Sequence, residues 1–150
     1  MRVLVVDDND DIVLLLRFAL VSHGIDVISA AGGPQALEWL KHSTPDAVIL
    51  DIQMPEMDGW ETLRRIRTGD VASDVPVILC TVKGRPVDAH RGWEAGCDGY
   101  VMKPFEIESL VAEVRSVTSR DANDRERFRR EGLAQAKDRL EEALRAKERI

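Results

Sequence analysis

The sequence has little of several features that mark particular classes of protein. Aromatic residues make up 5% of its 150 residues, there are two cysteines, and no apolar run approaches the 18 residues of a membrane-spanning helix. The apolar run Val3–Val6 near the start is too short for the core of a signal peptide. Cys80 and Cys97 lie in apolar segments without metal-ligand spacing, which favours reduced, buried thiols. These absences predict a cytoplasmic protein that does not insert into a membrane.

The charges of the chain divide it into an acidic body and a mixed tail. Residues 1–119 contain 11 Lys and Arg against 19 Asp and Glu, a net charge of −8, whereas residues 120–150 contain 10 against 8, a net charge of +2. Neither region has a continuous basic block, so we expect no direct binding of nucleic acid by this chain. The hydrophobic fraction of 44% is enough for one core, which predicts one domain over residues 1–119 and a charged helical tail over residues 120–150.

Short β-branched runs alternate with amphipathic helical patterns through residues 1–119. The expected strands are Val3–Val6, Asp26–Ser29, Ala47–Leu50, Val77–Cys80 and Gly99–Met102, and the expected helices cover residues 10–22, 34–42, 58–68, 86–95 and 106–118. Apolar runs without alternation are typical of parallel strands that are buried on both faces. The pattern predicts an α/β, doubly wound, five-stranded parallel sheet of order 2-1-3-4-5, flavodoxin-like, flanked by five helices.

Acidic residues gather where this fold places a ligand site, at the carboxyl ends of the strands. Asp7 and Asp8 follow the first strand and Asp51 ends the third, and the sheet order makes these two strands neighbours. Two carboxylates about 4 Å apart repel by roughly 4 kcal/mol at an effective dielectric constant near 20, so the group needs a cation or protons. Oxygen ligands without His or Cys favour Mg²⁺, with Mn²⁺ as a substitute. Alternatively, Asp7 and Asp8 only cap the helix that follows.

Two further strand ends also carry polar groups. Thr81 follows the fourth strand and supplies a hydroxyl, and Lys103 follows the fifth and supplies an ammonium. No glycine-rich loop follows the first strand, which excludes a dinucleotide fingerprint and a nucleotide P-loop. Four strand ends thus direct a carboxylate, a hydroxyl or an ammonium toward one crevice.

These motifs together resemble the receiver domain of bacterial two-component response regulators, the CheY-like family. The resemblance covers residues 1–119 and is carried by Val5-Val6-Asp7-Asp8, the run DIQMPEMDG at residues 51–59, Thr81, and Gly96-Cys97-Asp98-Gly99-Tyr100 continuing into Lys103-Pro104-Phe105. It implies a signal-transduction protein that accepts a phosphoryl group and switches conformation to control a partner or output domain.

The resemblance also implies a set of roles at the site. Asp51 would accept the phosphoryl group from a sensor histidine kinase or a phosphotransfer protein, so the chain would be a phosphoacceptor with self-catalysed transfer and dephosphorylation and not a turnover enzyme. Mg²⁺ would be held by Asp8, Asp51 and the backbone carbonyl of Gln53, with Asp7 acting through water.

The remaining roles concern the switch. Lys103 would face the phosphoryl group as a point charge, oriented by a cis peptide bond to Pro104. Thr81 would move to hydrogen-bond the phosphoryl group and Tyr100 would swing inward behind it, changing an output face over residues 85–118. Val82 stands where the family usually has Ala or Gly, and we expect its bulk to slow self-hydrolysis of the acyl phosphate.

Two other functions share some of these sequence features. A haloacid-dehalogenase-like phosphatase also uses an Asp nucleophile after a strand, but it requires a second Asp where this chain has Gln53. A receiver that signals by protein contact without phosphorylation would not need the set formed by Asp7, Asp8, Asp51, Thr81 and Lys103.

The tail is too short for a DNA-binding output domain and is expected to be helical. Asn123 and Glu126 could form a capping box. Apolar residues follow at spacings of three and four at Leu133, Ala136, Leu140 and Ala143, and then at Ile150 after an interruption at Lys147. The tail therefore extends the helix over residues 106–118 and pairs with another chain as a short coiled coil, links to an output domain beyond Ile150, or is a solvated segment. Homodimerisation is expected to use residues 85–118, the 120–150 helix, or both.

Overall fold

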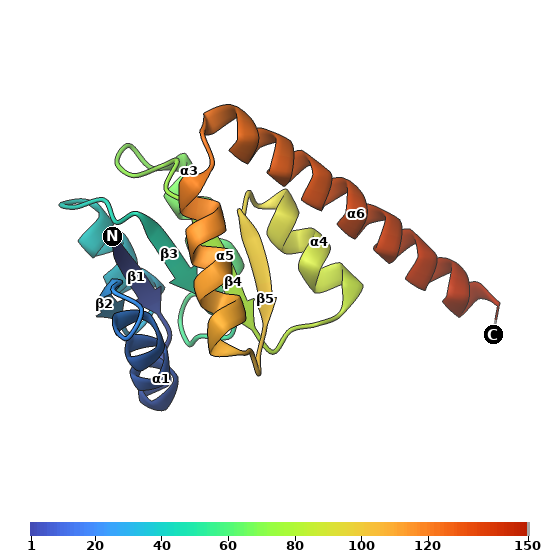
Figure 1. Cartoon of the computed structure of the whole chain (residues 1–150). Helices are drawn as coiled ribbons and strands as arrows, with labels where there is room; N and C mark the ends of the chain where they lie inside the picture. Colours follow the sequence, from blue (N-terminus) through green and yellow to red (C-terminus); the bar gives the residue numbers. More distant parts are fainter. Residues whose placement is uncertain (150) are drawn as a thin grey trace.

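The computed structural model describes residues 1–149, so the apolar position expected at Ile150 lies outside the described residues. Five strands form one parallel sheet in the order β2-β1-β3-β4-β5 (Figure 1). They are β1 (Arg2–Val6), β2 (Asp26–Ala30), β3 (Ala47–Leu50), β4 (Val77–Thr81) and β5 (Gly99–Met102). The helices are α1 (Asp10–Val21), α2 (Gly33–Leu40), α3 (Gly59–Thr68), α4 (Pro86–Glu94), α5 (Ile107–Ser119) and α6 (Ala122–Glu148). The predicted doubly wound α/β fold and its strand order are confirmed.

The central strands are buried on both faces because their residues alternate between two apolar clusters. One cluster joins residues of α2 and α3 to one face of the sheet, and Trp93 of α4 packs against it. The other joins residues of α1 and α5 to the opposite face, where Val3 and Val5 of β1 point. Every residue of β3 and β4 is buried. The uninterrupted apolar runs in the sequence follow from this two-sided burial.

Helix α1 begins without the help of Asp7 or Asp8. Its N-cap is Asn9, whose side-chain oxygen accepts hydrogen bonds from the backbone N–H groups of Asp11 and Ile12 at 3.0 and 3.3 Å. The alternative in which the two acids serve only as helix caps is therefore wrong. Asp7 instead accepts a hydrogen bond at Oδ1 from the backbone N–H of Asn9 at 2.9 Å, before the helix begins.

Helix α6 is a new helix and not a continuation of α5. The backbone is extended at Arg120, and the Asp121 side chain accepts a hydrogen bond from the backbone N–H of Asp124 at 2.8 Å, which makes Asp121 the N-cap. A new helix follows, as a capping box would indicate, but its N-cap is Asp121, two residues before Asn123. The alternative in which the tail extends the helix over residues 106–118 is wrong. After the break, α6 runs alongside α4 of the same chain and then projects beyond the body (Figure 1).

Two further expectations concern the cysteines and membrane insertion. Cys80 and Cys97 are free and buried, as their apolar surroundings in the sequence indicated. Within residues 1–149, no helix is both long enough and apolar enough to cross a bilayer.

Candidate functional site

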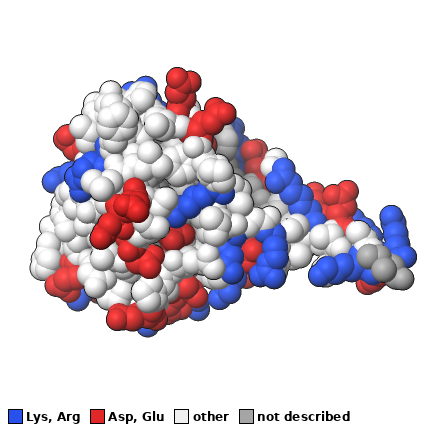
Figure 2. All heavy atoms as spheres, turned by 90° about the horizontal axis from the view of Figure 1, so that it is seen from below, with Lys and Arg blue, Asp and Glu red and all other residues white. Residues whose placement is uncertain are grey.

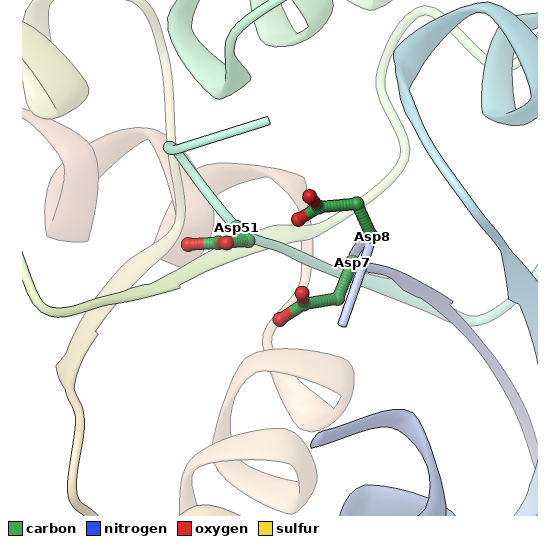
Figure 3. Close-up of side chains that lie close together, drawn as sticks. All are labelled: Asp7, Asp8 and Asp51. Atoms are coloured by element: carbon green, nitrogen blue, oxygen red, sulfur yellow. The ribbon is translucent and has the colours of Figure 1, made fainter. Parts of the chain in front are cut away.

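Three carboxylates meet at the carboxyl end of the sheet (Figure 3). Val6 of β1 pairs with Leu50 of β3, so the residues that follow them, Asp7 and Asp51, emerge side by side. One carboxylate oxygen of each of Asp7, Asp8 and Asp51 lies within 4.8 Å of the others. Asp7 and Asp51 are buried, whereas Asp8 is exposed to solvent. The cluster is thus partly enclosed and open on the side of Asp8.

The same edge of the sheet is acidic at the molecular surface. Figure 2 looks onto the lower edge of Figure 1, where the strands end, and shows acidic atoms gathered on the body within a largely uncharged surround. The projecting part of α6 carries both signs of charge in this view. The negative charge of residues 1–119 is therefore concentrated in part at the strand ends.

Lys103 neutralises part of this cluster from the end of β5. Its ammonium donates a hydrogen bond to Asp7 Oδ2 at 2.8 Å and lies 3.7 Å from Asp51 Oδ1. The Lys103–Pro104 peptide bond is cis, and Pro104 itself is exposed. Burial acts to lower the pKa of Lys103, but its hydrogen bond to Asp7 and the charges of Asp51 and Asp7 outweigh burial and leave the pKa raised.

The ionised form of Asp51 is disfavoured by its surroundings. Its pKa is raised because it is buried and because Asp7 is close, although Lys103 opposes the shift. Its Oδ1 atom accepts a hydrogen bond from the backbone N–H of Ile52 at 2.8 Å. The backbone of the exposed Gln53 also donates to this carboxylate and favours its ionised form. A cation beside Asp51 would relieve the repulsion that burial intensifies.

Thr81 and Tyr100 are connected through one residue between them. Thr81 is fully buried at the end of β4, and its hydroxyl oxygen accepts a hydrogen bond from the backbone N–H of Lys83 at 3.2 Å. The hydroxyl of the half-buried Tyr100 donates to the backbone carbonyl of the same Lys83. Burial raises the pKa of Tyr100, so the phenol is a hydrogen-bond donor at neutral pH. The two side chains thus hold both backbone groups of Lys83.

Sequence reasoning missed the role of Gly59 in shaping the loop that carries Asp51. A Cβ atom at Gly59 would lie 2.3 Å from the backbone oxygen of Asp51 and 2.7 Å from Cα of Ile52. The Gly59 N–H donates to the carbonyl of Ile52 at 2.8 Å, which closes the loop, and Asp58 caps α3 behind it. The Asp-Gly pair at the end of the 51–59 run was the available signal for this close approach.

A family model described as the response regulator receiver domain matches residues 3–115. The chain belongs to this family. The match spans all five strands and the acid cluster, so the receiver resemblance of the sequence is confirmed. Receiver domains act in two-component signal transduction, in which their phosphorylation controls an output.

Curated relatives of the receiver domain are response regulators. The chain is 39% identical over 124 residues to response regulator MprA of Mycobacterium sp. (strain KMS), covering 82% of this chain and 53% of the relative. It is 40% identical over 119 residues to the transcriptional regulatory protein PrrA of Mycobacterium tuberculosis, covering 79% of this chain and 50% of the relative. The chain therefore spans about half the length of the curated relatives that it matches.

Solved receiver structures share the fold over the same region. A response regulator from Chloroflexus aurantiacus has a TM-score of 0.76 and 34% identity, covering 79% of this chain and 98% of that chain. The chemotaxis protein CheY4 of Vibrio cholerae has a TM-score of 0.73 and 30% identity, covering 77% of this chain and 97% of that chain. The family model ends at residue 115, before α6 begins.

Proposed function

We propose that this receiver accepts a phosphoryl group on Asp51 in a reaction that requires a divalent cation. The observation that carries the proposal is the convergence of Asp7, Asp8 and Asp51 within 4.8 Å, with the Lys103 ammonium 3.7 Å from Asp51 Oδ1. The nucleophile, the metal-binding acids and the cationic group required for phosphoryl transfer thus lie at one sheet edge.

The donor set fits Mg²⁺, and Mn²⁺ in its place. Asp8 and Asp51 would bind the ion together with the backbone carbonyl of Gln53, and Asp7 would act through a bound water. All of these ligands are hard oxygen atoms, and the exposure of Asp8 leaves room for the waters that Mg²⁺ retains. Bound Mg²⁺ would offset negative charge on the oxygens of the transferring phosphoryl group.

The side chains of this chain supply the rest of the transfer. One carboxylate oxygen of Asp51 attacks phosphorus. The new O–P bond forms as the P–N bond of a phosphohistidine breaks, and the departing imidazole nitrogen keeps the electron pair. Lys103, already beside Asp51, then faces the phosphoryl oxygens as a positive charge.

The partner that donates the phosphoryl group is a sensor histidine kinase or a phosphotransfer protein. Since each transfer modifies Asp51 itself, the chain acts as a phosphoacceptor that catalyses its own modification and hydrolysis and does not turn over a separate substrate. We also propose a homodimer through residues 85–118 or through α6. Because α6 lies along α4 of its own chain, a dimer through α4 requires α6 to move.

Intact-mass spectrometry after incubation with acetyl phosphate tests the proposal. We expect one added phosphoryl group with Mg²⁺, none when EDTA replaces the metal, and none in Asp51→Asn. Asp70→Asn removes an exposed acid outside the cluster and should be modified like the natural chain. Absence of the adduct in the natural chain would contradict the proposal and favour a receiver that signals by contact alone.

A further inference from the structure

Helix α6 covers the surface formed by α4 and β5, and its apolar stripe faces its own chain. Ala136 is 5% exposed, and Leu133, Leu140 and Ala143 are all partly buried, whereas the residues between them are exposed. At Gly132 the helix lies directly on the indole of Trp93, because a Cβ atom there would be 2.6 Å from the ring. The apolar residues whose spacing resembles that of a coiled coil therefore pack against the same chain.

Two arginines of α6 fasten its first turns to Asp98, a buried carboxylate in the loop before β5. Arg125 Nε and Arg129 Nε donate to Asp98 Oδ1 at 3.0 and 3.1 Å. Asp98 also accepts from Arg67 Nη2 at 3.0 Å and from the backbone N–H of Val77 at 2.9 Å. Burial acts to raise the pKa of Asp98, but the hydrogen bonds from Arg125 and Arg129 outweigh it and leave the pKa lowered.

The hydrogen bonds of Arg125 and Arg129 to Asp98 can break without leaving Asp98 unpaired. If α6 leaves, Asp98 keeps the hydrogen bonds from Arg67 and Val77, so no buried carboxylate is left without a partner. Arg125 and Arg129 would enter water, where guanidinium groups are well solvated. Their departure also reduces crowding of positive charge around Arg67, whose pKa is lowered to about 10 by burial and by the charge of Arg129. Release of α6 breaks the ion pairs of Arg125 and Arg129 with Asp98 and with the exposed Asp74, and it leaves Asp98 with two hydrogen-bond donors.

A cavity separates part of α6 from the receiver residues Gly84, Tyr100 and Met102. A cavity of about 280 Å³ lies between them, and its lining includes Tyr100, Met102 and Gly84 on the receiver side and Gln135, Ala136 and Arg139 on α6. The cavity is partly open to solvent, so α6 does not fill the space beside Tyr100 in this part of the interface. Tyr100 reaches from the cavity to the carbonyl of Lys83.

Lys83 joins this cavity to the phosphorylation site. Its N–H is bound by the Thr81 hydroxyl and its carbonyl by the Tyr100 hydroxyl. If Thr81 turns toward a phosphoryl oxygen on Asp51, the hydrogen bond from Lys83 breaks. The segment that begins at Lys83 and includes Gly84 then loses one of its two anchors, and the cavity wall beneath α6 changes shape.

We propose that α6 is a phosphorylation-controlled cap, which rests on the α4–β5 surface in the unmodified chain and is released when Asp51 is phosphorylated. The inference rests on the proposed phosphorylation of Asp51. It assigns to residues 120–149 a regulatory contact with their own receiver domain. Because coupling between two binding events is reciprocal, weakening the cap must also favour phosphorylation. Helix α6 has two states, docked and free. The ion pairs of Arg125 and Arg129 with Asp98 favour the docked state, and phosphorylation of Asp51 favours the free state.

Hydrogen exchange followed by mass spectrometry on the full chain tests the cap. With Mg²⁺ and acetyl phosphate, we expect amide exchange to rise at least about fivefold in α6 and in α4, while exchange in α2 stays unchanged. Asp51→Asn under the same conditions should show no rise. The intact mass of each sample is measured in parallel. A missing adduct would overturn the proposed function, whereas a full adduct with unchanged exchange in α6 would overturn the cap alone.

Variants of α6 test the reciprocal effect. Arg125→Ala with Arg129→Ala should raise exchange in α6 without phosphorylation. It should also raise the equilibrium affinity of the site for beryllofluoride with Mg²⁺, a non-covalent mimic of the phosphoryl group, by about fivefold or more. Arg127→Ala with Arg130→Ala removes two exposed arginines of the same helix and serves as the matched control. An unchanged affinity in the first double variant, despite a released helix, would overturn the coupling.

Gly132→Ala separates docking from helix stability. Alanine favours an isolated helix relative to glycine by about 1 kcal/mol, yet its Cβ would meet the Trp93 ring. We expect α6 to remain helical by circular dichroism while its protection against exchange falls. A gain in protection would contradict the docking of α6 on Trp93.

Discussion

The Lys103 ammonium is hydrogen-bonded to Asp7 at 2.8 Å and lies farther, at 3.7 Å, from Asp51. In the absence of a metal ion, the lysine therefore serves chiefly as the counter-ion of a buried acid at the end of β1. On phosphorylation, a second anionic group competes for the same ammonium. Lys103 thus stabilises the unmodified protein through Asp7 and is also the cation that faces the phosphoryl group on Asp51.

Lys103→Ala should destabilise the metal-free protein and abolish efficient phosphorylation. Asp7 and Asp51 would then face each other without a cation, and we expect a loss of about 2 kcal/mol in the free energy of unfolding, less than for a fully enclosed pair because the site is open beside Asp8. Urea denaturation with EDTA and with Mg²⁺ measures this. Mg²⁺ should recover part of the lost stability. An equal loss with and without Mg²⁺ would contradict the claim that Mg²⁺ and Lys103 neutralise the same carboxylates.

Asp51→Asn should stabilise the metal-free protein at neutral pH. The folded-state pKa of Asp51 is raised, so ionisation of this carboxyl costs more in the folded than in the unfolded protein. The cost is absent at pH values below the unfolded pKa of about 4, and it grows as the pH rises through the folded pKa. The advantage of the Asn variant over the natural chain in urea denaturation should therefore be present at pH 7 and vanish near pH 3. An advantage that increases in acid would contradict this account.

Gly59→Ala should impair the site by displacing the loop after Asp51. Its Cβ would meet the Asp51 carbonyl at 2.3 Å, and overpacking of this kind costs roughly 1–3 kcal/mol. We expect a lower midpoint of thermal unfolding and slower modification by acetyl phosphate. Gly32→Ala is the control, because the backbone there is extended and the nearest atom, 3.0 Å from the new Cβ, ends the flexible Gln35 side chain. Equal effects of the two substitutions would exclude a specific role for Gly59.

Val82→Ala should shorten the lifetime of the acyl phosphate. Val82 follows Thr81 directly after β4 and is 59% exposed. A smaller side chain would admit water more readily to the phosphoryl group. The decay of the phosphorylated species, measured by intact mass after removal of acetyl phosphate, should be faster in the variant. Identical decay rates in the two proteins would refute the prediction.

The sheet and the acid cluster were predictable because they depend on local patterns and on strand order. Strands buried on both faces leave uninterrupted apolar runs, and the order 2-1-3-4-5 makes the residues after β1 and β3 neighbours. The capping role was not decidable in this way, since Asp7, Asp8 and Asn9 are all good N-cap residues. Only the structure shows that Asn9 is the N-cap, because its side chain accepts hydrogen bonds from the N–H groups of Asp11 and Ile12.

The docking of α6 was not predictable from its spacing alone. A stripe at intervals of three and four residues shows that one face of a helix is apolar, but it does not show whether the partner is another chain or the same one. The choice depends on pairs far apart in sequence, namely Gly132 with Trp93 and Arg129 with Asp98. Asp98 was noted within a family motif, yet nothing around it indicated that three arginines would converge there.

The central claim is that Asp51 is the phosphoacceptor, and chemical trapping tests it most directly. Borohydride reduces an aspartyl phosphate to the alcohol, so treatment of the chain after Mg²⁺ and acetyl phosphate should convert Asp51 to homoserine. Peptide mass spectrometry should find this change at residue 51, and it should be lost when EDTA replaces Mg²⁺. Homoserine at Asp7, Asp8 or another acid with Asp51 intact, or none at any position, would contradict the account.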